Sequence, residues 1–112
     1  MTAPQLFSYR AELIRIIDGD SLQFLIDLGF HTHVKTTCRL VGINCPEMNT
    51  KEGKAARAFV EAWFASSKTC IVSTVKDKRE KYGRWLARVT DAEGCCLNET
   101  LVIEGLAVPY ME

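Results

Sequence analysis

Hydrophobic residues alternate with polar ones along three consecutive stretches, residues 9–17, 20–28 and 31–41. A period of two is typical of β-strands, because successive side chains point to opposite faces of a sheet. The first stretch contains doubled apolar pairs, which predict a β-bulge or a bent strand. The other two are more regular, and each has one face of similar side chains: Leu22, Phe24, Ile26 and Leu28 in the second, and Val34, Thr36, Cys38 and Leu40 in the third.

Residues 51–67 show a different period, in which apolar side chains recur every three or four residues. This spacing forms one stripe along an α-helix. Asn49 or Thr50 is positioned to cap the helix, and Glu52 lies in the first turn, where the helix dipole favours a negative charge. We predict a helix over residues 51–67 whose stripe belongs to the core: Ala56, Phe59, Val60, Trp63 and Phe64.

Two further strand-like stretches follow, at residues 69–75 and 85–91, and Asn98 is positioned to cap a short final helix. Three strands, a helix, two strands and a short helix is the order of an OB-fold, although other β-rich folds use the same number of strands. We predict one β-rich α+β domain over residues 1–112. It is a five-stranded barrel with a helix between the third and fourth strands and a short helix after the fifth.

The charges of the chain cancel, since fourteen lysines and arginines stand against fourteen aspartates and glutamates. Such neutrality argues against a protein that wraps nucleic acid by bulk positive charge. It leaves room for a small site with locally placed cations, and residues 76–84 form a locally basic segment.

The five cysteines are odd in number, and none of them has the C-x-x-C spacing of a zinc site. We interpret them as reduced, mostly buried thiols in a reducing compartment. Residues 1–13 contain no apolar segment of the kind found in secretory signals, and no apolar run approaches membrane length. These features predict a cytoplasmic protein that does not contact a membrane.

Three polar segments lie at the ends of the predicted strands: residues 17–21 (Ile-Asp-Gly-Asp-Ser), 39–47 (Arg-Leu-Val-Gly-Ile-Asn-Cys-Pro-Glu) and 81–84 (Lys-Tyr-Gly-Arg). Asp20 has the parity of the apolar face of its strand, so its carboxylate is expected to point inward. A buried carboxylate is costly unless it is paired, hydrogen-bonded or bound to a metal. One such segment is more typical of a turn, but three together favour a site.

These segments resemble the signature blocks of the staphylococcal nuclease-like (thermonuclease) family, and residues 98–107 are similar to the family's helix after the fifth strand. The resemblance implies an OB-fold that hydrolyses phosphodiester bonds in DNA and RNA with bound calcium. It implies endonucleolytic cleavage with little sequence preference and products that carry a 3′-phosphate and a 5′-hydroxyl. DNA, RNA or both are therefore the expected partners.

The resemblance also assigns metal ligands and a base. Asp20 matches the family's first calcium-binding aspartate, and Cys45 matches a position whose backbone carbonyl binds the ion. Asn44 stands where the family has a second calcium-binding aspartate. Oxygen atoms of these kinds are the ligands that calcium prefers. Glu47 matches the glutamate that orients or deprotonates the attacking water.

The remaining matches concern the substrate. Arg39 and Arg84 match two arginines that clamp the phosphate. Arginine suits this role because it stays protonated and donates two parallel hydrogen bonds to phosphate oxygens. Tyr82 and Tyr110 match tyrosines near the bound nucleotide, where a ring offers a stacking face. Lys81 belongs to the basic segment that attracts phosphate.

Three features depart from the family pattern. Asn44, a residue also typical of turns, brings no charge, which weakens calcium binding because affinity follows ligand charge. Cys45 replaces the usual threonine, and its thiol is open to oxidation. The chain ends at Glu112, where many relatives continue, so a partner or second copy is expected to cover barrel surface, and we expect a monomer or weak homodimer.

The departures leave two alternatives to a calcium-dependent nuclease. One is a nuclease that uses another divalent cation. The other is a catalytically weak or inactive module that binds nucleic acid or protein on the same fold. His31 and His33 share a strand face, but no third ligand is near in sequence, so we interpret them as exposed edge residues.

Overall fold

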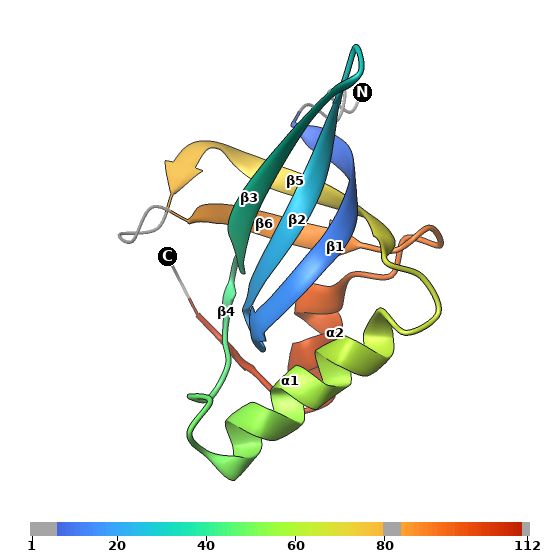
Figure 1. Cartoon of the computed structure of the whole chain (residues 1–112). Coiled ribbons are helices and arrows are strands. Elements are labelled where there is room, and N and C mark those ends of the chain that lie inside the picture. The colour runs from blue at the N-terminus through green and yellow to red at the C-terminus, as the bar shows by residue number, and fades with distance from the viewer. Residues whose placement is uncertain (1–6, 80–83, 111–112) are drawn as a thin grey trace.

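Five strands close into a barrel in the order β1-β2-β3-β6-β5, and two helices lie below it (Figure 1). The computed structural model describes residues 7–79 and 84–110. Neither helix is long and apolar enough to span a membrane. The barrel strands are β1 (Ser8–Asp18), β2 (Ser21–Gly29), β3 (Thr32–Leu40), β5 (Thr69–Arg79) and β6 (Trp85–Thr90), the helices are α1 (Lys51–Trp63) and α2 (Leu97–Ile103), and a short ribbon pairs β4 (Ile43–Asn44) with β7 (Val108–Pro109).

This arrangement confirms the predicted barrel and the positions of both helices in it, whereas the β4–β7 ribbon was not predicted. Neighbouring barrel strands run antiparallel except at one seam, where residues 38–40 of β3 pair in parallel with residues 85–87 of β6. β1 shifts its register against β2 at two places, between Leu13 and Arg15 and between Ile16 and Asp18. These irregularities confirm the bulged first strand, which bends to pair with both β2 and β5.

Apolar side chains of the barrel strands fill the interior, and Leu22, Phe24, Cys38 and Leu40 are fully buried. The same strand faces carry Leu28 and Val34, but these two are 45% and 43% exposed. The reason is that the β2–β3 hairpin continues beyond the closed part of the barrel, where no other strand of the described residues pairs with it (Figure 1). Alternation predicts which side chains share a face, but not where the barrel stops covering that face.

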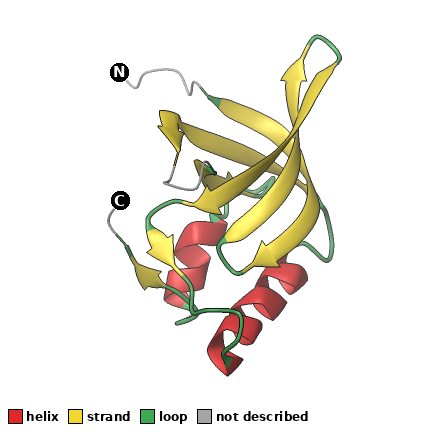
Figure 2. Cartoon of the chain, turned by 60° about the vertical axis from the view of Figure 1, so that its left-hand side comes forward, coloured by secondary structure: helices red, strands yellow, loops and turns green. Residues whose placement is uncertain are grey.

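Helix α1 begins as predicted, because the Thr50 hydroxyl accepts a hydrogen bond from the N–H of Gly53 at 3.0 Å. It ends at Trp63, so the predicted continuation to residue 67 is wrong. Residues 65–68 are exposed and include two serines, which favour caps and turns over helix interiors. Helix α1 lies below the barrel (Figure 2), and Ala56, Val60 and Phe64 of its stripe are buried.

Helix α2 corrects the role predicted for Asn98. The N-cap is Cys96, and Asn98 lies inside the first turn with its side chain buried. That side chain accepts a hydrogen bond from the N–H of Val89 (3.1 Å) and donates to the carbonyls of Val41 (2.9 Å) and Ala87 (3.1 Å). Asn98 therefore ties α2 to β6 and to the segment after β3.

The cysteines carry free thiols at all five positions. Cys38, Cys70 and Cys96 are buried as expected, whereas Cys95 is exposed. Burial raises the pKa of Cys38 to about 11 and that of Cys70 to about 12. Both thiols therefore remain protonated at neutral pH and behave as small core residues.

Candidate active site

Strand pairing brings residues 17–21 and 39–47 together with Arg84 at one end of the barrel, where the β1–β2 turn lies near the end of β3 (Figure 1). Ser21, the first residue of β2, pairs with Arg39 of β3, which places Asp20 beside Arg39. Arg39 also pairs with a β6 residue two positions after Arg84. We call Asp20, Ser21, Arg39 and Arg84 the arginine rim.

The Arg39 guanidinium is buried, with 8% of the residue exposed, and it is surrounded by oxygen atoms. Nη1 donates to the carbonyl of Leu40 (3.3 Å), and Nη2 donates to the carbonyl of Ile43 (3.1 Å) and to Oδ1 of Asn44 (3.1 Å). Nη2 also lies 3.8 Å from Oδ2 of Asp20. A cation fixed in this way needs little reorganisation to meet an anion.

Arg84, the residue before β6, reaches the same place, because its Nη1 donates a hydrogen bond to the hydroxyl of Ser21. Ser21 is almost completely buried and is the residue opposite Arg39 in the β2–β3 ladder. Ser21 therefore joins the two arginines: its backbone pairs with Arg39, and its hydroxyl accepts a hydrogen bond from Arg84. Sequence reasoning missed Ser21, because its parity places it on the outer face of β2 and gives no sign that Arg84 covers it.

Asp20 is 9% exposed, which agrees with the prediction that its side chain points inward. Oδ2 accepts a hydrogen bond from the N–H of Cys45 at 3.0 Å. The pKa of Asp20 is nevertheless raised to about 6, chiefly by burial and then by the hydrogen bond with the Asp18 side chain, while the Cys45 N–H and Arg39 act in the lowering direction. Two neighbouring carboxylates in a partly buried turn store unfavourable charge energy.

Asp18 is a second residue that sequence reasoning left without a role, although it stands in the Asp-Gly-Asp segment. Its Oδ1 accepts a hydrogen bond from the N–H of Asp20 at 3.1 Å, which closes the turn between β1 and β2. The carboxylates of Asp18 and Asp20 are therefore held on the same short turn. The signal in the sequence was the pair of aspartates separated by glycine.

The donor set suits a hard cation in part. The carboxylates of Asp18 and Asp20 are the ligand type that calcium prefers, and a cation would relieve the penalty that raises the Asp20 pKa. The Cys45 carbonyl accepts no hydrogen bond from the described residues, whereas the amide oxygen of Asn44 is engaged by Arg39. Residues 7–79 and 84–110 contain no group of three or more histidine, cysteine, aspartate or glutamate side chains that could hold a metal. Carbonyl, amide or water oxygens would have to complete the site.

Glu47 lies on the same loop, two residues after Cys45, but the structure fixes its backbone and not its carboxylate. The Glu47 carbonyl accepts hydrogen bonds from the hydroxyl (2.6 Å) and the N–H (3.0 Å) of Thr50. The side chain is exposed, and within the described residues it makes no hydrogen bond or ion pair. Glu47 is thus available to solvent, and no contact joins it to Asp20 or Arg39.

Helix α1 braces both carboxylate segments. A Cβ on Gly53 would lie 1.9 Å from the Glu47 carbonyl oxygen, and a Cβ on Gly19 would lie 2.9 Å from Cβ of Ala56. These glycines allow the helix to touch the Glu47 backbone and the Asp18–Asp20 turn directly. Arg57 adds a hydrogen bond from Nη2 to the carbonyl of residue 16, at the second bulge of β1 (3.2 Å).

Tyr110 is brought to the arginine rim by the β4–β7 ribbon. Its N–H donates to the carbonyl of Gly42 (2.8 Å), and its ring centroid lies 5.4 Å from Cζ of Arg39. This is the geometry of a cation–π contact. The other two predicted substrate-binding residues, Lys81 and Tyr82, lie outside the described residues.

Comparison with known proteins identifies the class to which this small barrel belongs. The model of the staphylococcal nuclease homologue family matches residues 37–112, which is more than half of the chain. The chain therefore belongs to this family, as its motifs predicted. The matched range contains Arg39, Glu47 and Arg84, whereas Asp20 precedes it.

Two curated relatives are similar over most of this chain. One from Escherichia coli O157:H7 and one from Escherichia coli are each named an uncharacterized endonuclease, and each is 26% identical over 98 residues. The aligned part covers 88% of this chain and 59% of the relative. The chain thus spans little more than half the length of the curated relatives that it matches.

Proposed function

We propose that this protein is a metal-dependent nuclease that hydrolyses phosphodiester bonds within DNA, RNA or both, with calcium as the cation and a 3′-phosphate on the product. Membership of the staphylococcal nuclease homologue family and two relatives named endonucleases support this proposal. The observation that carries it is the arginine rim, where a buried Arg39 lies beside Asp20 and shares its β2 partner Ser21 with Arg84.

The two arginines would bind the scissile phosphate. Arginine suits this role because its planar guanidinium presents N–H groups that match two phosphate oxygens. Negative charge grows on these oxygens as water attacks, so fixed cations stabilise the transition state more than the ground state. The hydrogen bonds that fix the Arg39 head supply this preorganisation.

Asp20, with Asp18 and the Cys45 carbonyl, would hold the cation. A divalent ion bound there would neutralise phosphate charge and polarise the phosphoryl group. Because the pKa of Asp20 is raised to about 6, protons compete with the cation for this carboxylate as the pH falls toward 6. Asn44 is the remaining candidate ligand, and its participation requires the amide oxygen to leave Arg39.

Glu47 would act as the general base toward the attacking water, a role that contributes roughly 10²–10⁴-fold to a rate. Its carboxylate is exposed and carries no competing partner among the described residues. Tyr110 would support the sugar or base next to the phosphate, and Lys81 and Tyr82 are proposed to contact the same substrate. Contacts to phosphate and ring faces carry little base information, which is consistent with weak sequence preference.

Nicking of supercoiled plasmid tests the proposal. We expect cleavage with millimolar calcium, manganese or magnesium, its loss with chelator, and a rate for Glu47→Gln that is lower by roughly 10²–10⁴-fold. Lys51→Ala changes an exposed residue at the start of α1. It is the matched control and should cleave normally. Absence of cleavage with all three cations would contradict a nuclease.

Asn44 favours a second candidate, a module of the same fold that binds nucleic acid without cleaving it. Its side chain is neutral and already bonded to Arg39. If Asn44→Asp creates strong cleavage in a protein that is otherwise inert yet binds single-stranded DNA, the natural chain is a binder. If the wild type cleaves and Asn44→Asp only lowers the calcium concentration required, the natural chain is a nuclease.

A further inference from the structure

The β4–β7 ribbon holds Asn44 in a defined place beside the arginine rim. Asn44 is the second residue of β4, and it lies opposite Val108 of β7 in the antiparallel ladder. The N–H of Tyr110 donates to the carbonyl of Gly42 at 2.8 Å, which extends the ribbon by one more hydrogen bond. Asn44 is exposed as a residue, so backbone pairing rather than burial sets its position.

The side chain of Asn44 is directed at Arg39. Nη2 of Arg39 donates to Oδ1 of Asn44 at 3.1 Å and to the carbonyl of the preceding residue, Ile43, at 3.1 Å. Because a guanidinium group has donors and no acceptor, the amide oxygen is the atom that must face Arg39. The same ribbon brings the ring of Tyr110 to 5.4 Å from Cζ of Arg39. Three residues of the ribbon segment therefore hold one guanidinium group.

An amide oxygen holds a cation without neutralising it. The carboxylate of Asp20 already lies 3.8 Å from Nη2 of Arg39. A second carboxylate at position 44 would accept a stronger hydrogen bond, but its charge would also oppose the approach of a phosphate to the same guanidinium group. Asparagine supplies the acceptor and adds no negative charge.

The same contact argues against Asn44 as a ligand of the cation. A metal ion on Oδ1 would lie close to Nη2 of Arg39, which is 3.1 Å from that oxygen, and the two positive groups would repel each other. A carboxylate such as that of Asp20 brings a negative charge that attracts both groups, whereas an amide brings none. Asn44 can therefore serve the guanidinium group or the metal ion, and the structure has it on the guanidinium group.

We infer that Asn44 is a positioning residue for Arg39 and not a ligand of the cation, although it stands where the family has a metal-binding aspartate. The ribbon keeps the amide oxygen on the guanidinium group, which is thereby held in place with its charge intact. The cation is left to Asp20, Asp18 and the carbonyl of Cys45. The benefit for phosphate binding rests on the proposed function, whereas the contact itself needs no substrate.

Rotation of the Arg39 guanidinium group tests the contact without any ligand, from ¹⁵N signals of the full chain recorded in chelator. Asn44→Ala should make this rotation faster by about tenfold, because a hydrogen bond to a charged group is lost. Asn44→Asp keeps an acceptor, so rotation should stay slow. Asn49→Ala, which changes an exposed asparagine of the following loop, is the matched control and should have no effect. Equal rotation in Asn44→Ala and the wild type would overturn the inference.

Calorimetric titration with calcium, in the absence of nucleic acid, tests whether Asn44 is a metal ligand. The calcium affinity of Asn44→Ala should stay within about twofold of the wild type, whereas Asp20→Asn should lose about tenfold or more, because affinity follows ligand charge. A loss in Asn44→Ala as large as that in Asp20→Asn would assign Asn44 to the cation and overturn the inference.

Titration with octathymidylate in chelator tests the phosphate side. Asn44→Ala should weaken binding by about three- to tenfold, because the guanidinium group loses a partner that holds it. Asn44→Asp should weaken binding by a similar factor although the guanidinium group stays held, because its carboxylate competes with the phosphate. Tighter binding by Asn44→Asp than by the wild type would contradict the role of a neutral acceptor and overturn the inference.

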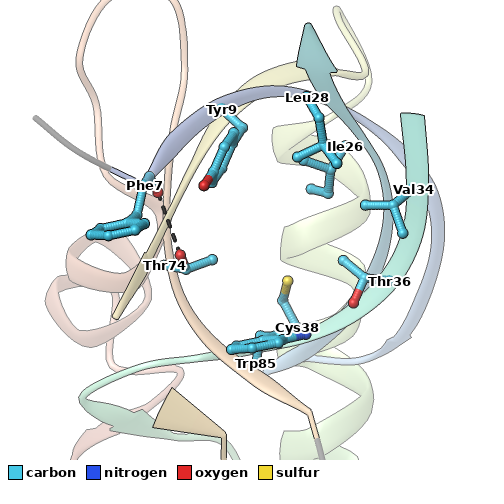
Figure 3. A pocket seen from close by; sticks show the side chains of 9 residues that line it. All are labelled: Phe7, Tyr9, Ile26, Leu28, Val34, Thr36, Cys38, Thr74 and Trp85. Carbon is cyan, nitrogen blue, oxygen red and sulfur yellow. Dashed lines mark hydrogen bonds between the residues drawn. The ribbon is translucent and has the colours of Figure 1, made fainter. Parts of the chain in front are cut away.

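The apolar cavity of the barrel does not compete in these titrations. This cavity of about 320 Å³ lies at Leu28 and Val34, toward the other end of β2 and β3, and the side chains that line it in Figure 3 are all uncharged. If the wild type binds neither calcium nor octathymidylate while rotation responds as predicted, the nuclease proposal fails and the positioning of Arg39 stands. If the wild type binds both and rotation does not respond to Asn44→Ala, the inference fails and the nuclease proposal stands.

Discussion

The two ends of β3 reverse the usual distribution of polar and apolar residues. Near its end, the charged Arg39 is 8% exposed, whereas near its start the apolar Val34 is 43% exposed. A buried charge needs compensating partners, whereas a single exposed valine does not. At the arginine rim the partners are present in the chain as carbonyls, Asn44 and Asp20. Near the start of β3, Val34 lies opposite Ile26 of β2 and is only partly covered.

The Arg39 side chain is thus held by several hydrogen bonds, whereas the Val34 side chain is held by few contacts. A change at the rim disturbs several hydrogen bonds at once, because one guanidinium serves many acceptors. A substitution in the exposed first half of β3 changes the free energy of unfolding little, because exposed side chains contribute little to stability.

Arg39→Ala should produce the largest loss. It leaves the buried Asp20 carboxylate without its cation and three acceptors without a donor, and breaking a buried pair of this kind costs about 3–5 kcal/mol of unfolding free energy. Urea denaturation measures it. Lys35→Ala, at the other end of the same strand, is the matched control and should change stability by less than about 0.5 kcal/mol. A similar loss of unfolding free energy in both variants would show that the two ends of β3 do not differ in this way.

Gly53→Ala should come next, although alanine is the better helix former by about 1 kcal/mol. The new Cβ would stand 1.9 Å from the Glu47 carbonyl oxygen, so the helix or the loop must move. We expect a net destabilisation of about 1–3 kcal/mol in urea, together with slower cleavage as Glu47 shifts. Lys54→Ala, one exposed position further along α1, controls for helix propensity. A more stable Gly53→Ala protein would show that the brace is absent.

Asp20 should make the metal-free protein more stable as the pH falls. Its folded pKa of about 6 lies above the ordinary value of 3.8 for an aspartate, so the folded state binds the proton more tightly than the unfolded state. This contribution is complete below pH 3.8 and is lost as the pH rises through 6. The Tm of the wild type minus that of Asp20→Asn should therefore be higher at pH 5 than at pH 7.5, measured in chelator. A constant difference would mean that the Asp20 pKa is not raised.

Phe30→Asn should give the smallest effect and the opposite sign. Phe30 is 99% exposed at the hairpin tip and has a φ of 55°, a left-handed conformation that asparagine tolerates better than phenylalanine. We expect a gain of about 0.5–1 kcal/mol, because strain is relieved and no contact is lost. Destabilisation by this change would show that the tip packs against something in solution.

The sequence predicted the five-stranded barrel and its two helices, because alternation and helical spacing are local properties. The resemblance to the nuclease family predicted that Asp20, Arg39 and Arg84 share one site. The sequence did not predict the burial of Ser21 or the exposure of Leu28, since both depend on where neighbouring strands end. Asn98 was mistaken for a cap because an asparagine before an apolar helix has the same pattern whether it bonds its own helix or bridges three backbones. Hydrogen bonds to residues far away in the chain produce no periodic pattern in the sequence.

The central claim is that a cation and two arginines hold the same phosphodiester at the arginine rim. Calorimetric titration of the Glu47→Gln protein with a short single-stranded oligonucleotide, with and without calcium, tests it most directly. The account predicts that calcium tightens oligonucleotide binding, that the oligonucleotide tightens calcium binding by the same factor, and that Asp20→Asn abolishes this coupling. Oligonucleotide affinity that is the same with and without calcium would contradict it.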